Sequence, residues 1–250
     1  MIKAILCDLD GTLLDINFHD FMREYVTGVA RYFADCIPPA RFQKELVASL
    51  EAMIVNDVPG RTVLQAFLDD FGQRVPLPPD AIDRFNAYYE TEFPKLETYG
   101  RPAPGARALL EAALDRGLMV VIATAPFYPE RPIRERLRWA QLDDLPYRLI
   151  TSSDVMHRSK PFPEYYLEIA QKIGVAPAEC LMIGDETVMD GAAAHAGMQV
   201  ALVGPERESF TAAYVTDPAV LRLLEPGALQ LPRYPDLAHL AAQLRAAGIL

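Results

Sequence analysis

The chain has 250 residues, enough for one core that buries about 70–75% of the unfolded surface, or for a core with a smaller companion domain. Its 34 acidic and 24 basic residues give a net charge of -10, which disfavours nucleic acid as a partner, because such binding depends on cationic side chains. With 51% hydrophobic residues and no low-complexity tract, the composition is that of a globular protein rather than a disordered one.

The N-terminal segment and the cysteines narrow the class of protein further. Charge interrupts the first apolar residues at Lys3 and Asp8, too early for a secretory leader or a membrane span, so we expect a cytoplasmic protein without membrane association. Cys7, Cys36 and Cys180 are odd in number and widely spaced, which disfavours a disulfide framework or a zinc site. No pattern in the sequence indicates an oligomeric state.

The first part of the chain reads as one strand followed by helices. The apolar run from Ile2 to Cys7 predicts a strand buried on both faces, ending at a turn signalled by Asp10 and Gly11. Apolar residues at helical spacing then predict four helices, with no strand signal among them. These helices are expected around residues 18–33, 42–54, 63–71 and 82–93.

The pattern changes at the Pro-rich segment 101–105, after which helices and strands alternate. Such alternation is typical of a parallel sheet with right-handed crossovers. The predicted strands are 118–124, 147–151, 180–184 and 199–203, and the predicted helices are 106–115, 133–139, 164–173, 190–196 and 237–246. Several prolines predict irregular structure in the segment 204–235, which carries no motif.

The simplest architecture is a doubly wound α/β core with an inserted helical domain. Residues 1–14 and 100–250 would form the core, and residues 15–99 an all-helical cap. Ligands of such sheets bind at the carboxyl ends of the strands. Polar residues follow four of the predicted strands at these ends, so we expect them to meet in one crevice: Asp8, Asp10, Thr124, Lys160, Asp185 and Asp190.

The sequence Asp8-Leu9-Asp10-Gly11-Thr12, followed in order by Gly184-Asp185 and Asp190, resembles the haloacid dehalogenase superfamily. The resemblance spans residues 1–203 and is to the phosphatase branch with a C1-type helical cap after the first strand. It implies a phosphatase that hydrolyses a small phosphorylated metabolite through an aspartyl-phosphate intermediate. The dehalogenase branch is disfavoured, because its members usually lack a second aspartate such as Asp10.

The resemblance also implies a role for each residue. Asp8 would be the nucleophile, and Asp10 would protonate the leaving group and then activate water. Thr124, Lys160 and the main-chain amide of Ala125 would hold the phosphoryl oxygens, where similar phosphatases often have Asn instead of Ala125. Magnesium would bind the carboxylates of Asp8 and Asp185 and the main-chain carbonyl of Asp10, with Asp190 a ligand or a neighbour of one.

The charges of these residues independently call for a cation. Four carboxylates around a phosphate dianion, opposed only by Lys160, cannot all remain ionised in a crevice without a divalent ion. Mg²⁺ suits a site that offers only oxygen ligands and reaches a substrate phosphate.

Other readings stay open. Asp8 and Asp10 could be turn residues, and Asp190 could be the N-cap of the helix that follows it. A phosphomutase would need a proton shuttle in the cap, for which His19 is the candidate. A non-catalytic relative that binds a phosphorylated ligand is the third alternative. The residues Phe127-Tyr128-Pro129-Glu130 either border the pocket or pack in the core.

Overall fold

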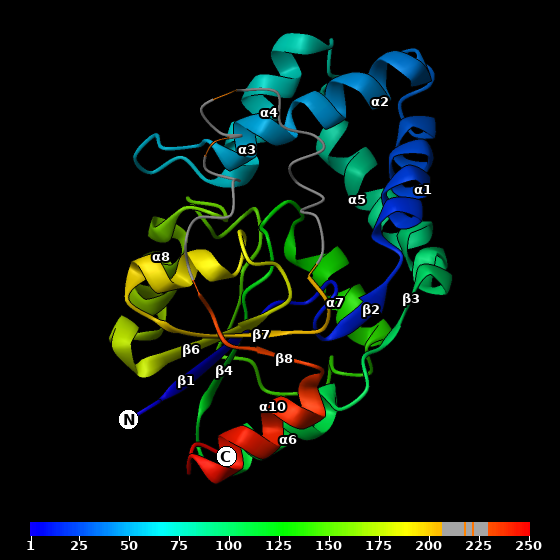
Figure 1. Ribbon diagram of the computed structural model, residues 1–250. Coiled ribbons are helices and arrows are strands. Elements are labelled where there is room, and N and C mark those ends of the chain that lie inside the picture. Colours follow the sequence, from blue (N-terminus) through cyan, green and yellow to red (C-terminus); the bar gives the residue numbers. More distant parts are fainter. Residues whose placement is uncertain (207–217, 219–221, 223–229) are drawn as a thin grey trace.

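The computed structural model describes residues 1–206 and 230–250, together with Pro218 and Arg222 (Figure 1). A large part of the segment 204–235, for which the sequence predicts irregular structure, therefore lies outside the described residues. No helix among the described residues is long and apolar enough to cross a membrane.

A six-stranded parallel sheet lies at the centre, in the order β5-β4-β1-β6-β7-β8 (Figure 1). The strands are β1 (Ala4–Cys7), β4 (Met119–Ile122), β5 (Leu149–Ile150), β6 (Cys180–Gly184), β7 (Gln199–Val203) and β8 (Arg233–Tyr234). In β1, Leu6 lies opposite Val121 of β4 and Met182 of β6. Every residue of β1 is buried, as predicted for a strand covered on both faces.

Helices cover both faces of this sheet, which confirms the predicted doubly wound α/β fold (Figure 1). On one face α6 (Ala106–Asp115) packs against β4 and against α10 (Leu237–Ala246), which also contacts β7 and β8. On the other face the short helix η3 (Gly191–Ala196) contacts β6 and β7 and packs against α8 (Pro163–Ile173). The remaining core helices are α7 (Glu130–Trp139) and the short η2 (Pro177–Glu179).

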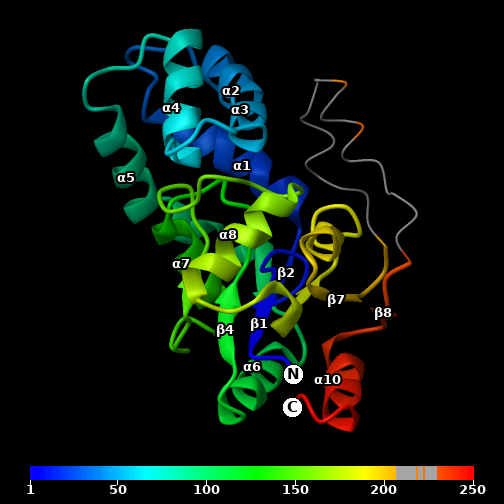
Figure 2. The same ribbon diagram turned by 90° about the vertical axis from the view of Figure 1, so that its left-hand side faces the viewer.

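Five helices within residues 18–91 form a separate layer at one end of the molecule (Figure 2). They are α1 (Phe18–Arg31), α2 (Pro39–Ala48), α3 (Leu50–Ile54), α4 (Val63–Arg74) and α5 (Ala81–Thr91), and the short η1 (Phe93–Tyr99) leads back to the core. Packed phenylalanine rings join them: the ring centroids of Phe33 and Phe42 lie 4.7 Å apart, and those of Phe42 and Phe71 5.2 Å. The proposed cap, residues 15–99, contains all of these helices.

Two short strands that the sequence analysis missed connect this layer to the core. Strand β2 (Leu14–Ile16) pairs antiparallel with β3 (Gly100–Pro102), so that Asp15 lies opposite Arg101. The pair lies at the two points where the chain leaves and re-enters the proposed core. Its three-residue strands are too short to give a periodic signal in the sequence.

Three predicted elements differ in detail. The predicted helix 42–54 is two helices, α2 and α3, separated at Ser49, a residue type that competes for backbone hydrogen bonds and weakens helices. The predicted strand 147–151 is reduced to the two residues of β5. The predicted helix 190–196 is the 3₁₀ helix η3, and Asp190 stands at its N-cap position but makes no capping hydrogen bond with its side chain.

Candidate active site

Three polar residues follow adjacent strands at one edge of the sheet. Asp8 follows β1, Thr124 lies two residues beyond the end of β4, and Asp185 follows β6. The hydrogen bonding between β1 and β6 continues as far as the site, because the N–H of Asp8 donates to the carbonyl of Ile183 at 2.8 Å. Since β1 lies between β4 and β6, the three side chains meet around the tip of the central strand.

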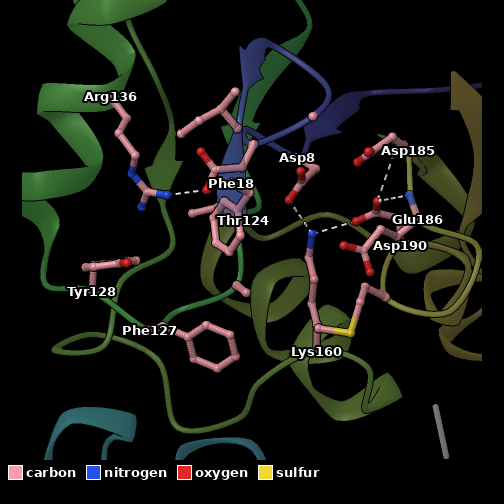
Figure 3. A pocket seen from close by; sticks show the side chains of 15 residues that line it. Asp8, Phe18, Thr124, Phe127, Tyr128, Arg136, Lys160, Asp185, Glu186 and Asp190 are labelled. Atoms are coloured by element: carbon pink, nitrogen blue, oxygen red, sulfur yellow. Dashed lines mark hydrogen bonds and ion pairs between the residues drawn. The ribbon is translucent and has the colours of Figure 1, made fainter. Parts of the chain in front are cut away.

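Lys160 links two carboxylates of this edge (Figure 3). Its ammonium lies 2.7 Å from Oδ1 of Asp8 and 2.6 Å from Oδ1 of Asp190, and the residue is 1% exposed. Burial disfavours the ammonium, but the charges of Asp190 and Asp8 outweigh it, so the pKa of Lys160 lies well above its usual value. The side chain is therefore a fixed positive charge beside Asp8.

Asp190 is held by both of its carboxylate oxygens. While Oδ1 accepts the bond from Lys160, Oδ2 accepts the main-chain N–H groups of Asp185 and Glu186, each at 3.0 Å. The residue is 1% exposed and fixes the loop that follows β6. Instead of capping η3, its side chain organises the loop that carries Asp185.

Two glycines permit this close packing. A Cβ atom at Gly184 would lie 2.1 Å from Cγ of Asp190. A Cβ atom at Gly11 would lie 2.3 Å from Oδ2 of Asp185, and Gly11 has a φ of +89°, which favours glycine. Both positions therefore require glycine for steric reasons.

We expect Gly184→Ala to destabilise the fold by about 1–3 kcal/mol, because the added methyl group collides with the buried Asp190. Gly72→Ala is the matched control: its Cβ would meet nothing closer than 3.7 Å, and it lies in α4, where Ala is roughly 0.5–1 kcal/mol better than Gly. Urea denaturation of both variants measures the difference. Equal unfolding midpoints would contradict the packing around Gly184.

The carboxylates of Asp8, Asp185 and Asp190 form a candidate metal site. One oxygen from each lies within 4.8 Å of the others, and all three residues are buried. Burial and the charges of Asp190 and Asp185 raise the pKa of Asp8 well above its usual value, although Lys160 opposes them. These carboxylates carry more negative charge than Lys160 alone can neutralise. A cluster of this kind, with oxygen donors only, fits a hard divalent cation.

Asp10 lies beside this cluster but contributes no carboxylate to it. Its Oδ2 accepts a hydrogen bond from Nη1 of Arg136, and burial raises the pKa of Asp10 although Arg136 opposes the shift. Arg136 lies on α7, is 1% exposed, and has its guanidinium carbon 4.6 Å from the ring centroid of Tyr128. Arg136 is not among the site residues predicted from the sequence.

These residues surround a cavity of about 140 Å³ (Figure 3). Every predicted site residue lines it, and so do Phe127 and Tyr128, which settles that they border the pocket. Glu130 does not line it, and neither does His19, whose side chain is 77% exposed on α1. The lining residues with polar side chains are Asp8, Asp10, Thr124, Tyr128, Arg136, Lys160, Asp185, Glu186 and Asp190.

The main-chain carbonyl of Thr124 is fixed by two buried hydroxyls, from Thr151 and Tyr165, each at 2.8 Å. These contacts hold the loop after β4, including Ala125, against the cavity. The side chain of Thr124 is 3% exposed and faces the same space (Figure 3).

Comparison with known proteins identifies what this arrangement resembles. The family model for haloacid dehalogenase-like hydrolases matches residues 2–197. The chain is 30% identical over 188 residues to N-acetylmuramic acid 6-phosphate phosphatase of Pseudomonas aeruginosa, covering 74% of each protein. It is 28% identical over 197 residues to phosphoglycolate phosphatase of Xanthomonas campestris pv. campestris, covering 78% of this chain and 80% of that protein.

Solved structures share the fold at lower sequence identity. One is a HAD family hydrolase from Deinococcus radiodurans R1 with bound phosphate and sodium, which has a TM-score of 0.55 and 24% identity. The match covers 100% of this chain and 97% of that one, so the likeness includes the helical layer as well as the sheet.

Proposed function

Because this chain belongs to the haloacid dehalogenase-like hydrolases, we propose that it hydrolyses the phosphate monoester of a small metabolite, with Asp8 as nucleophile. The observation that carries the proposal is the contact of Lys160 with Asp8 at the tip of the central strand, beside Asp185. A carboxylate next to a fixed cation and a metal-binding cluster is suited to attack on phosphorus. Relatives named as phosphatases of two different metabolites support the same reaction class.

In the first step, a carboxylate oxygen of Asp8 forms a bond to phosphorus while the bond to the alcohol oxygen breaks. Lys160 neutralises charge on the transferring phosphoryl oxygens, and the hydroxyl of Thr124 and the amide of Ala125 donate to them. In the second step, water attacks the phosphorus of the aspartyl phosphate, which releases inorganic phosphate and regenerates Asp8.

Asp10 would transfer the proton in both steps. Its raised pKa, caused by burial, favours a carboxyl that holds a proton for the leaving alcohol. Once the proton has left, the hydrogen bond from Arg136 stabilises the carboxylate that accepts a proton from water. We therefore assign Arg136 as a positioning residue that orients Asp10 toward the reacting oxygen.

The carboxylates of Asp8 and Asp185 and the main-chain carbonyl of Asp10 would hold Mg²⁺, which supplies charge stabilisation to the phosphoryl group. Asp190 would be a neighbour of the metal rather than a ligand, because both of its oxygens already accept hydrogen bonds. It would act by holding Lys160 and the loop of Asp185.

We expect Asp185→Asn to weaken Mg²⁺ binding at least tenfold, because the amide removes a charge that faces the ion. Magnesium titration of the substrate-free protein, followed by isothermal calorimetry, measures this directly. Asp115→Asn, an exposed substitution at the end of α6, makes the same chemical change away from the site and should leave the affinity unchanged. Equal affinities in the two variants would contradict the assignment.

The experiment that tests the function is a phosphate-release screen over phosphorylated metabolites with and without Mg²⁺. A phosphomutase would return the phosphoryl group to a sugar, so product analysis with a bisphosphate separates that alternative. Its candidate shuttle, His19, does not line the cavity, which disfavours it. A non-catalytic relative would release no phosphate from any ester.

A further inference from the structure

A second cavity, of about 90 Å³, lies between the helical layer and the loop that follows β4. Side chains of α1, α2, α3, α4 and α5 line it, together with the loop Phe127–Pro129 and Ser153. Phe18, Phe127 and Tyr128 belong to the lining of both this cavity and the catalytic one. The two cavities therefore adjoin, with the catalytic carboxylates at one end and the helical layer at the other.

The lining of the second cavity is almost entirely apolar. It contains no acidic, basic or histidine side chain among the described residues, and Asn86 and Ser153 are its only amide and aliphatic hydroxyl groups. The tyrosine hydroxyls already have partners: that of Tyr25 lies 3.0 Å from that of Tyr89, and that of Tyr128 donates to the sulfur of Met22. A polyhydroxylated or charged group would lose its hydration there and could gain only the side chains of Asn86 and Ser153 as partners.

The cations beside the adjoining catalytic cavity do not change this conclusion. Lys160, which contacts Asp8, and Arg136, which contacts Asp10, line the catalytic cavity and not the second one. A substrate carboxylate in the second cavity, such as that of phosphoglycolate, would meet no cation among the described lining residues.

Resting on the proposed function, we propose that the substrate is the phosphate monoester of an alcohol with a short alkyl group, and that this group occupies the second cavity. An apolar cavity of about 150 Å³ is large enough for benzene, so a cavity of 90 Å³ takes about three or four carbon atoms. The phosphate lies at Asp8 and Lys160, and the apolar group passes Phe18 and Phe127 into the helical layer.

The test uses alkylphosphonates from methyl to decyl, which carry a phosphate-like head and are not hydrolysed. Each methylene that enters the cavity should tighten binding about fourfold in the presence of Mg²⁺, as measured by calorimetry. The gain should total on the order of 100-fold over three or four carbons and then level off. The rate constants kcat/KM for the matching alkyl phosphates should rise in parallel, and that for phosphoglycolate should stay near that for methyl phosphate.

Two variants of α4 give a matched comparison. Leu68→Trp places a large ring in the cavity and should abolish the gain with chain length. Gln73→Trp adds the same ring on an exposed part of α4 and should retain the gain. Should Leu68→Trp fail to fold, Leu68→Ala enlarges the cavity instead. The affinity for alkylphosphonates should then continue to rise to longer chains before it levels off.

The outcomes separate this inference from the proposed function. Phosphate release from every ester at a rate that does not depend on chain length overturns the inference and leaves the phosphatase assignment standing. A faster reaction with phosphoglycolate than with any alkyl phosphate also overturns it. Phosphonate binding that tightens with chain length, without phosphate release from any ester, supports the cavity's occupant and overturns the catalytic assignment.

Discussion

Asp8→Asn is expected to reduce phosphate release by roughly 10⁴- to 10⁶-fold, the range found when a catalytic nucleophile is removed. The amide nitrogen and oxygen of asparagine cannot form the acyl phosphate that the proposed first step requires. Initial rates with the best substrate measure the loss. Intact-protein mass after acid quenching should show one added phosphoryl group on the wild type and none on the variant.

The stability of Asp8→Asn distinguishes this loss from misfolding. Burial and two neighbouring carboxylates oppose the ionised Asp8 more strongly than Lys160 favours it, so its pKa is raised. Asparagine has the same shape and an oxygen that can accept from Lys160, which also keeps its contact with Asp190, so the metal-free variant should remain folded. Asp115→Asn is the control for an unrelated charge change. A folded Asp8→Asn variant that retains the wild-type rate would exclude Asp8 as the nucleophile.

The core of the fold could be predicted from the sequence because its signals are local. The apolar runs of β6 and β7 and the stripe of α10 have the predicted bounds. Strands β2 and β3 could not be predicted, because three-residue strands gain their stability from a partner far away in the chain. The division of residues 42–54 into α2 and α3 at Ser49 leaves the spacing of the apolar residues unchanged, so periodicity does not report it.

The residues of the candidate site that follow the ends of strands could be predicted from the sequence. Adjacent parallel strands bring their carboxyl ends together, so Asp8, Thr124 and Asp185 had to meet once the sheet formed. The role of Asp190 could not be predicted, because it depends on hydrogen bonds to both of its carboxylate oxygens. Lys160 and the main-chain N–H of Asp185 donate these bonds, and they come close only in the folded protein. The apolar cavity in the helical layer could not be predicted either. An apolar stripe shows which face of a helix is buried, but not whether neighbouring side chains fill the space beside that face.

Arg136 was missed because it stands among arginines that face solvent. Arg134 and Arg138 flank it, and alternating charges on a helix usually mark an exposed face. A signal was nevertheless present: Arg136 lies three residues after Ile133 and one before Leu137, on the apolar stripe of α7. A charged residue on the buried stripe of a helix indicates a buried partner, which here is Asp10.

Arg136→Met is expected to destabilise the protein by about 3–5 kcal/mol, because it leaves Asp10 buried without its ion-pair partner. Methionine has a similar length and no charge, so the cavity it leaves is small. The double variant Asp10→Asn/Arg136→Met removes both charges and should recover most of this loss, since no uncompensated charge remains. Urea denaturation of the two single variants and the double variant measures the coupling, and additive losses would contradict a direct pair.

The pH dependence of Arg136→Met tests whether the residue also acts on the reaction. Arg136 opposes the effect of burial on Asp10, so its removal raises the pKa of that carboxyl further. The second step needs the carboxylate, so the acidic limb of the kcat profile should move to higher pH, while a purely structural role would lower kcat at every pH equally. Arg136→Lys, which keeps a charge near Asp10, should move the limb less. An unshifted limb in Arg136→Met would show that Arg136 does not tune Asp10.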